Sequence, residues 1–187
     1  MTDDEKYKWI EMHKWKFKAV WYTELYEKLV LMSRVRFGYL GHYNDEIGPT
    51  PFHRFYLGGD GLGSYNFDSR EIIGMRGYKN ESLTPSNGTR VTGGNIYTKY
   101  TLELRYPLSL NPSATIYVMG FAEAGNCWLG FENFNPFKVY RSAGVGARIY
   151  LPMFGLLGLD WGYGFDPVPG MDAHGSKFHF SIGGSID

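Results

Sequence analysis

The sequence predicts an all-β protein, an antiparallel transmembrane β-barrel, and three observations lead to this fold class. Aromatic residues make up 18% of the 187 residues and glycine contributes 25 of them, a composition that favours strands. Polar and apolar residues alternate with a period of two along several segments, which places them on opposite faces of a strand. The connections between these segments are alternately short and long, as in outer-membrane barrels.

Seven segments carry the alternation, and each is predicted to form a strand. The first places Trp15, Phe17, Ala19 and Trp21 on one face, with lysines between the first three of them. In the third, leucines and tyrosines alternate with charged residues. The expected strands are residues 14–21, 29–40, 96–106, 114–124, 139–150, 155–165 and 177–185.

The lengths of the connections predict how the two ends of the barrel differ. Outer-membrane barrels have short periplasmic turns and longer extracellular loops. The longest connection, 41–94, is therefore expected to be an extracellular loop. The short connections are 23–28, 107–113 and 152–154, and the long ones are 41–94, 126–138 and 166–176.

The polar face of the predicted strands carries charged residues, and where that face points differs between a membrane barrel and a soluble one. No segment reaches the roughly 18–20 apolar residues that a membrane helix needs, but strands can also span. In a membrane barrel the apolar face meets lipid and the polar face lines a water-filled lumen. A soluble sandwich or lipocalin-like barrel shows the same alternation and stays an alternative. The residues expected in the lumen are Arg34, Arg36, Glu103, Arg105, Glu123, Arg148 and Asp160.

Composition and residue spacing exclude several function classes. The 19 basic and 19 acidic residues cancel, so nothing in the charge indicates a nucleic-acid partner. The single cysteine, Cys127, rules out a disulfide framework and is expected to be an inert packing residue. The five histidines lack metal-ligand spacing, and no serine or cysteine stands near a credible base. We therefore expect no metal, no cofactor and no enzymatic activity.

Two runs within the long connection carry a specific resemblance. Residues 51–59 read Pro-Phe-His-Arg-Phe-Tyr-Leu-Gly-Gly, and 73–78 read Ile-Gly-Met-Arg-Gly-Tyr. Together they resemble the sixth extracellular loop of BamA and its relatives, the outer-membrane protein assembly and translocation barrels, whose loop carries a Val/Ile-Arg-Gly-Phe/Tyr tetrad. Here the tetrad is Met75, Arg76, Gly77 and Tyr78, with methionine in the first position. Segments 101–107, 121–128, 142–146 and 178–183 are similar to later strands of the family.

The resemblance covers about 14–183 and implies how much of a family barrel is present. It corresponds to the final seven strands of a larger, sixteen-stranded barrel. The whole chain, 1–187, is therefore expected to be one partial barrel domain, a C-terminal portion without the periplasmic POTRA domains, whose loop 41–94 folds inward. Family members usually end on an aromatic residue, whereas this chain ends on Ile186 and Asp187.

Arg76 is the strongest candidate site residue. If the third and fourth strands are neighbours, Glu103 and Glu123 lie side by side on their polar faces and repel each other unless a cation sits between them. The planar guanidinium of an arginine suits two carboxylates. The resemblance implies that Arg76 docks there when the loop folds into the barrel. The alternative is that Arg76 is a solvated loop residue and both glutamates line a watery lumen.

The resemblance also implies a function. A family member of this kind, located in the Gram-negative outer membrane, folds and inserts other β-barrels without a cofactor, and the seam between its first and last strands opens sideways. Its partners would be outer-membrane lipids, unfolded outer-membrane proteins and accessory lipoproteins that bind through the missing regions. Exposed strand edges can template incoming strands. The seam residues expected on the last strand are Phe178, Phe180, Ile182, Gly183 and Gly184.

Two other functions remain open at this point. A passive outer-membrane pore would use the long loop to narrow the lumen, and its charged residues would set ion preference. A sibling of the same family would instead secrete a polypeptide through the barrel. The tetrad does not separate this sibling from an assembly factor, because the family shares the loop.

Overall fold

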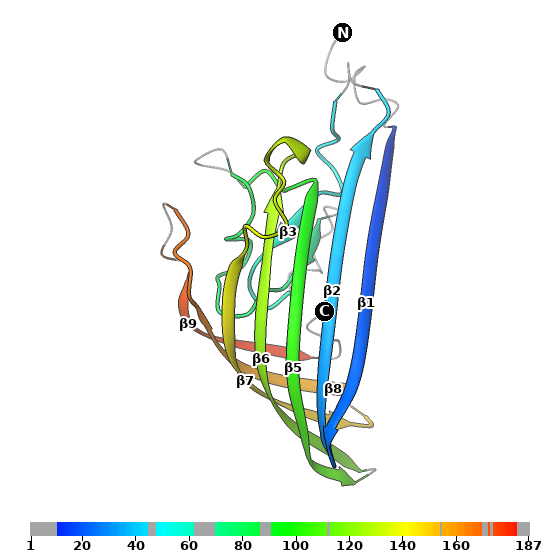
Figure 1. Cartoon of the computed structure of the whole chain (residues 1–187), viewed down its shortest axis with the longest axis vertical. Helices are drawn as coiled ribbons and strands as arrows, with labels where there is room; N and C mark the ends of the chain where they lie inside the picture. The colour runs from blue at the N-terminus through cyan, green and yellow to red at the C-terminus, as the bar shows by residue number, and fades with distance from the viewer. Residues whose placement is uncertain are drawn as a thin grey trace.

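The computed structural model describes residues 11–44, 48–61, 70–86, 91–111, 113–153, 155–169, 172 and 174–182. Its main element is a seven-stranded antiparallel sheet with the order β1-β2-β5-β6-β7-β8-β9. Figure 1 shows this sheet curling into part of a barrel wall. The predicted fold class is confirmed. The strands are β1 (Met12–Tyr26), β2 (Leu29–His42), β5 (Ile96–Asn111), β6 (Ala114–Trp128), β7 (Tyr140–Leu151), β8 (Gly155–Gly164) and β9 (Gly175–Ile182).

All seven predicted strands are present, and several are longer than the alternation indicated. β5 continues through Pro107 to Asn111, so that the turn to β6 is much tighter than the predicted 107–113 connection. The pairing of β5 with β6 shifts register between Pro107 and Ser109. Proline has no N–H to donate to the ladder, and such an irregularity is where a strand accommodates it.

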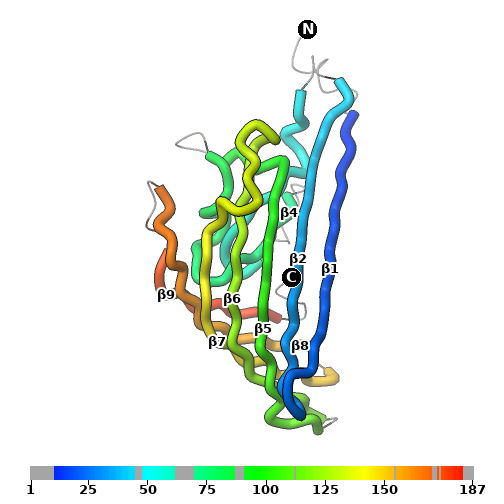
Figure 2. Tube along the Cα trace, viewed as in Figure 1, coloured from blue at the N-terminus to red at the C-terminus, as the bar shows by residue number. Residues whose placement is uncertain are grey.

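The connection between β2 and β5 folds back against the concave face of the sheet. It contains two short strands, β3 (Phe55–Leu57) and β4 (Glu71–Ile73), which pair in parallel. The sequence analysis did not predict this pair. Figure 2 shows the same arrangement as a tube, with the segment around β4 lying against the sheet. We call this connection, residues 43–95, the long loop, and the side of the sheet that it covers the inner face.

A small hydrophobic core joins the long loop to the inner face. Phe55, Leu57, Ile73 and Tyr78 of the loop pack there with residues of β2, β5 and β6. The rings of Phe55 and Tyr97 lie 4.7 Å apart, centroid to centroid. Cys127 is buried in this cluster with a free thiol, in keeping with a packing role.

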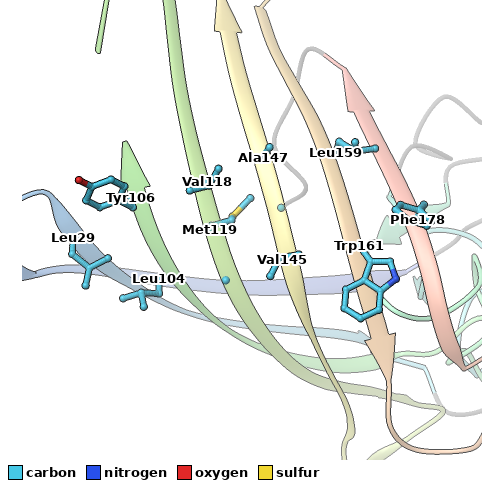
Figure 3. Close-up of a pocket in the computed structure, with 12 residues that line it drawn as sticks. Leu29, Leu104, Tyr106, Val118, Met119, Val145, Ala147, Leu159, Trp161 and Phe178 are labelled. Atoms are coloured by element: carbon cyan, nitrogen blue, oxygen red, sulfur yellow. The ribbon is translucent and has the colours of Figure 1, made fainter. Parts of the chain in front are cut away.

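The outer face of the sheet is apolar and exposed. Leu104 of β5, Val145 of β7 and Leu159 of β8 all point away from the loop and are 40–58% exposed. A shallow apolar depression of about 550 Å³ is lined by these side chains, which Figure 3 shows, and by Gly120 of β6. An exposed apolar face of this extent is typical of a surface that meets lipid. Within the described residues, no helix is long and apolar enough to cross a bilayer.

The charged residues of the inner face differ from the expectation of a water-filled lumen. Five of the seven are buried: Arg34, Glu103, Glu123, Arg148 and Asp160. The expectation is wrong for the centre of this face because the long loop packs over it. The charges of the acids there are balanced by buried basic side chains, where a water-filled lumen would have solvated them.

Candidate functional site

The Met75–Tyr78 tetrad lies immediately after β4 and is held in place by backbone pairing inside the loop. Met75 exchanges two backbone hydrogen bonds with Gly59, at 2.8 and 3.1 Å. Gly59 ends the run 51–59 and Met75 belongs to the run 73–78, so the two segments that resemble the family loop are paired with each other. The side chains of Met75, Arg76 and Tyr78 are completely buried. This part of the loop is therefore an internal element of the fold.

Arg76 lies between the two glutamates proposed from the sequence. Its Nη2 atom is 2.7 Å from Oε1 of Glu103 and 2.7 Å from Oε1 of Glu123. Its Nε atom and its backbone N–H donate to the two oxygens of Glu123, at 3.1 and 2.9 Å. The two acids lie diagonally on β5 and β6, since Glu103 pairs with Phe121 and Glu123 with Thr101.

The ionised form of Arg76 is strongly favoured in this position. Burial alone would lower the pKa of Arg76, but the surrounding carboxylates, Glu123 first among them, outweigh burial and raise it above its usual value. A buried charge pair of this kind costs roughly 3–5 kcal/mol when one partner is removed, because the other is left unpaired. Removal of Arg76 would therefore leave two buried carboxylates without their shared cation.

An aromatic ring supports the guanidinium from below. Arg76 lies 3.6 Å above the ring centroid of Phe121 on β6, within the range of a cation–π contact. The ring occupies space left by Gly144 of β7, where an added Cβ would come within 2.6 Å of the ring. A side chain at position 144 would displace the ring and, with it, the support under Arg76.

Lys99 of β5 is a second buried cation at the site. Its Nζ atom is 3.0 Å from Oε1 of Glu123 and donates a 2.6 Å hydrogen bond to the backbone carbonyl of Gly74. One lysine thus neutralises Glu123 and holds the loop just before the tetrad. The sequence showed Lys99 on the polar face, but the Gly74 contact depends on how the loop docks.

A third acid, Asp160 of β8, extends the cluster across the sheet. Its carboxylate accepts two hydrogen bonds from Arg148, at 2.9 and 2.8 Å, and lies 3.6 Å from Nη1 of Arg76. Gly146 on the neighbouring strand provides the space, because an added Cβ there would lie 1.9 Å from the aspartate. The charged cluster therefore links β5, β6, β7 and β8 through one loop residue.

Gly77 places the loop backbone directly on β8 and reaches β9. It adopts a φ of +87°, and an added Cβ would lie 2.7 Å from the backbone nitrogen of Gly164. Its N–H donates a buried 2.9 Å hydrogen bond to Nε2 of His179 on β9. Glycine is required here both for the left-handed backbone and for the close approach. His179 was not among the predicted site residues.

Tyr78 fastens the other side of the tetrad to the start of β7. Its hydroxyl donates to the backbone carbonyl of Arg141 at 2.8 Å and accepts from the backbone N–H of Asp166 at 3.2 Å. Burial raises the pKa of Tyr78 to about 12, so the phenol keeps its proton at neutral pH and can donate.

The predicted seam residues on the last strand divide between the two faces. Phe178, Phe180 and Ile182 point outward and are 74%, 49% and 54% exposed, whereas His179 and Ser181 point inward and are buried. Gly183 and Gly184 lie outside the described residues. The outward side chains suit contact with lipid, and the inward ones face the tetrad.

No acid–base or nucleophilic arrangement of the kind used in catalysis is evident among the described site residues, whose charged groups are paired with one another. The same residues include no group of three or more His, Cys, Asp or Glu placed to hold a metal ion. The arrangement is suited to holding a long loop against five strands.

The chain was compared with known families and structures. The model of the Omp85 superfamily domain matches residues 5–186. Among solved structures, the crystal structure of BamA from Haemophilus ducreyi lacking POTRA domains 1–3 is similar, with a TM-score of 0.66 and 19% identity. That match covers 91% of this chain and 34% of the other, so the chain spans about a third of that protein's length. No curated protein matches the chain.

Proposed function

Because the chain belongs to the Omp85 superfamily, a family of outer-membrane β-barrels for protein insertion and transport, we propose that it forms part of a factor that folds and inserts other β-barrels. We further propose that it lies in the Gram-negative outer membrane and works without nucleotide, metal or cofactor. The chemistry required is the exchange of hydrogen bonds between strands, which involves no covalent step.

The observation that carries this proposal is the buried contact of Arg76 with Glu103 and Glu123. A family loop that serves merely as an external flap has no need for a desolvated charge cluster with the wall. A wall whose seam must open, however, needs the rest of its strands held in register. The tetrad contacts β5 to β9 and is suited to that bracing role.

The seam itself is proposed to lie at the free edge of β9. Strand edges expose unpaired backbone groups that can pair with an incoming strand. The substrates would be unfolded outer-membrane proteins, which add their own terminal strands at this edge. Lipid would contact the outward side chains, and accessory lipoproteins would bind regions of the intact protein that this chain does not contain.

The packed loop also favours an assembly factor over a passive pore. The long loop covers the inner face and buries its central charges, whereas a constitutive ion pathway needs a hydrated passage. Conductance in planar bilayers tests this point. A steady, ion-selective current would favour a pore, and near-silent behaviour with rare openings would favour an assembly factor.

The central experiment replaces Arg76 in the full-length protein and measures insertion of a model β-barrel into lipid vesicles. We expect Arg76→Ala to lower the insertion rate strongly, because the loss leaves Glu103 and Glu123 uncompensated in a buried place. Arg76→Lys should also be impaired, since lysine is a point charge that lacks the planar fork.

A matched control is Lys138→Ala, which removes an exposed cation in the connection between β6 and β7, outside the charge cluster and away from the tetrad. We expect this variant to insert substrate at the normal rate. An Arg76→Ala protein that assembled and inserted barrels as fast as the wild type would contradict the proposed role of the tetrad.

A further inference from the structure

The hydrogen bond between Gly77 and His179 links the tetrad to the last strand. Gly77 lies in the long loop and His179 on β9, 102 residues apart in sequence, and the donor–acceptor distance is 2.9 Å. The side chain of His179 is buried on the inner face. Among the described strands, β9 is hydrogen-bonded to β8 alone, so the loop supplies a second attachment.

This attachment depends on the protonation state of the imidazole. A backbone N–H can only donate, so Nε2 of His179 must be the unprotonated nitrogen of a neutral ring. A protonated imidazole has N–H groups at both positions and no lone pair to offer. Protonation therefore places the N–H of Nε2 opposite the N–H of Gly77, and two donors cannot form a hydrogen bond.

Gly77 has little room to adjust if this bond is lost. Its backbone lies against β8, and an added Cβ at Gly162 would come within 2.9 Å of the Gly77 nitrogen. At such a close approach, water cannot readily replace the imidazole as acceptor. The buried N–H would then be unsatisfied, which costs more than an ordinary hydrogen bond contributes.

We propose that His179 is a positioning residue that holds β9 against the docked tetrad, and that its protonation frees β9 from the loop. The inference rests on the proposed function, because the strand that His179 retains is the one whose edge must become available at the seam. His179 thereby connects loop docking to seam opening, and it makes that connection sensitive to pH.

Several charged groups surround His179 and influence how readily its imidazole is protonated. Asp160 is its direct partner across β8 and β9. Arg76 and Asp60 of the loop and Glu123 of β6 also act on it electrostatically. Since these acids and bases would contribute to any change with pH, the test must separate their titration from that of His179.

The test measures hydrogen–deuterium exchange at the Gly77 amide in the full-length protein in lipid vesicles, expressed as a protection factor that removes the intrinsic effect of pH. For the wild type we expect protection to fall at least about fivefold as the pH is lowered from about 8 to about 5, a span that extends well below the histidine pKa of about 6.5 in model peptides. His179→Ala should show the low protection at both pH values.

His179→Gln is the conservative variant, because its amide oxygen can accept from Gly77 and does not titrate in this range. We expect it to keep the protection at both pH values. It therefore also reports whether the neighbouring charges, and not His179, cause a pH effect. Ser181→Ala is the matched control, since Ser181 is equally buried on the same face of β9.

Wild-type protection that does not change with pH, or His179→Ala protection equal to that of the wild type, would overturn the inference. A pH effect that persists in His179→Gln would also overturn it. The outcome is independent of the insertion assay. If the exchange results hold while Arg76→Ala inserts normally, the proposed function fails and the attachment of β9 stands.

Discussion

At the scale of single residues, the tetrad works by close contact as well as by charge. Arg76 is bound by Glu103 and Glu123 and rests on Phe121. Gly77 and Tyr78 then attach the loop to β8, β9 and the start of β7. Each residue type has a distinct physical requirement: a planar cation, a residue without Cβ, and a hydroxyl on a rigid ring.

Gly77→Ala is predicted to weaken loop docking without removing any charge. Alanine must adopt the left-handed backbone, which costs about 1–2 kcal/mol, and its Cβ would also meet the backbone of Gly164 at 2.7 Å. Thermal unfolding in lipid vesicles should therefore show a clear loss of stability. Gly175→Ala is the control, because Gly175 has a similar φ of +94° and open space around it. Equal losses in the two variants would show that the close approach is unimportant.

At the scale of the elements, the strands are two-faced, and the alternation in sequence explains which face each residue takes. β5 shows this clearly: Lys99 and Glu103 point to the loop, and Leu102 and Leu104 point away. The loop buries the inner face, and the charged residues there form ion pairs and hydrogen bonds, as Lys99 and Glu103 do. Among the described residues no segment covers the outer face in this way, and its exposed leucines suit contact with an apolar medium.

The loss of stability caused by an arginine on the outer face of β5 is predicted to depend on its depth in the membrane. Leu104→Arg, near the middle of the strand, should cost about 2–4 kcal/mol in lipid vesicles, because a charge at the bilayer midplane is poorly solvated. Leu110→Arg is the matched variant, with the same substitution on an exposed leucine near the end of the same strand. It should cost about 0–1 kcal/mol. Denaturant unfolding measures both, and equal small costs would favour the soluble alternative.

At the scale of the whole molecule, the long loop is attached from one edge of the sheet to the other. Lys14 of β1 contacts Glu71 at 2.7 Å and the carbonyl of His53 at 2.9 Å. At the far edge, Gly77 contacts His179 of β9. Contacts of such large sequence separation are costly to form, because each closes a long stretch of chain. Once formed, they connect β1 and β9 to the same loop and so hold the two edges of the curved sheet relative to each other.

Docking of the whole loop can be measured by its rate of cleavage by a protease. Trypsin added to vesicles should cleave the wild type slowly after Arg54, whose guanidinium is held by the carbonyls of Thr50 and Thr92 at 2.8 and 3.1 Å. Arg76→Ala should be cleaved there faster, because cleavage follows the population of the opened loop. Lys138→Ala, which removes an exposed cation outside the loop, should match the wild type. Unchanged cleavage in Arg76→Ala would mean that other contacts suffice to dock the loop.

The sequence by itself determined the seven strands of the main sheet and their two faces, and it carried the tetrad by which the family is recognised, because each depends on residues close together in the chain. Alternation around Leu102 and Leu104 is a local pattern, and so is Met-Arg-Gly-Tyr. Two acids on adjacent strands indicated that a cation is needed, and the resemblance of the loop to the family implied that Arg76 supplies it to Glu103 and Glu123.

Only the tertiary structure decided which other residues meet the tetrad. Lys99, Phe121, Asp160 and His179 each lie on the inner face, but their contacts depend on strand register and on the depth to which the loop descends. The parallel pairing of β3 with β4 depends on the same docking. These are contacts between distant parts of the chain, where a shift of one residue in register would turn every side chain to the other face.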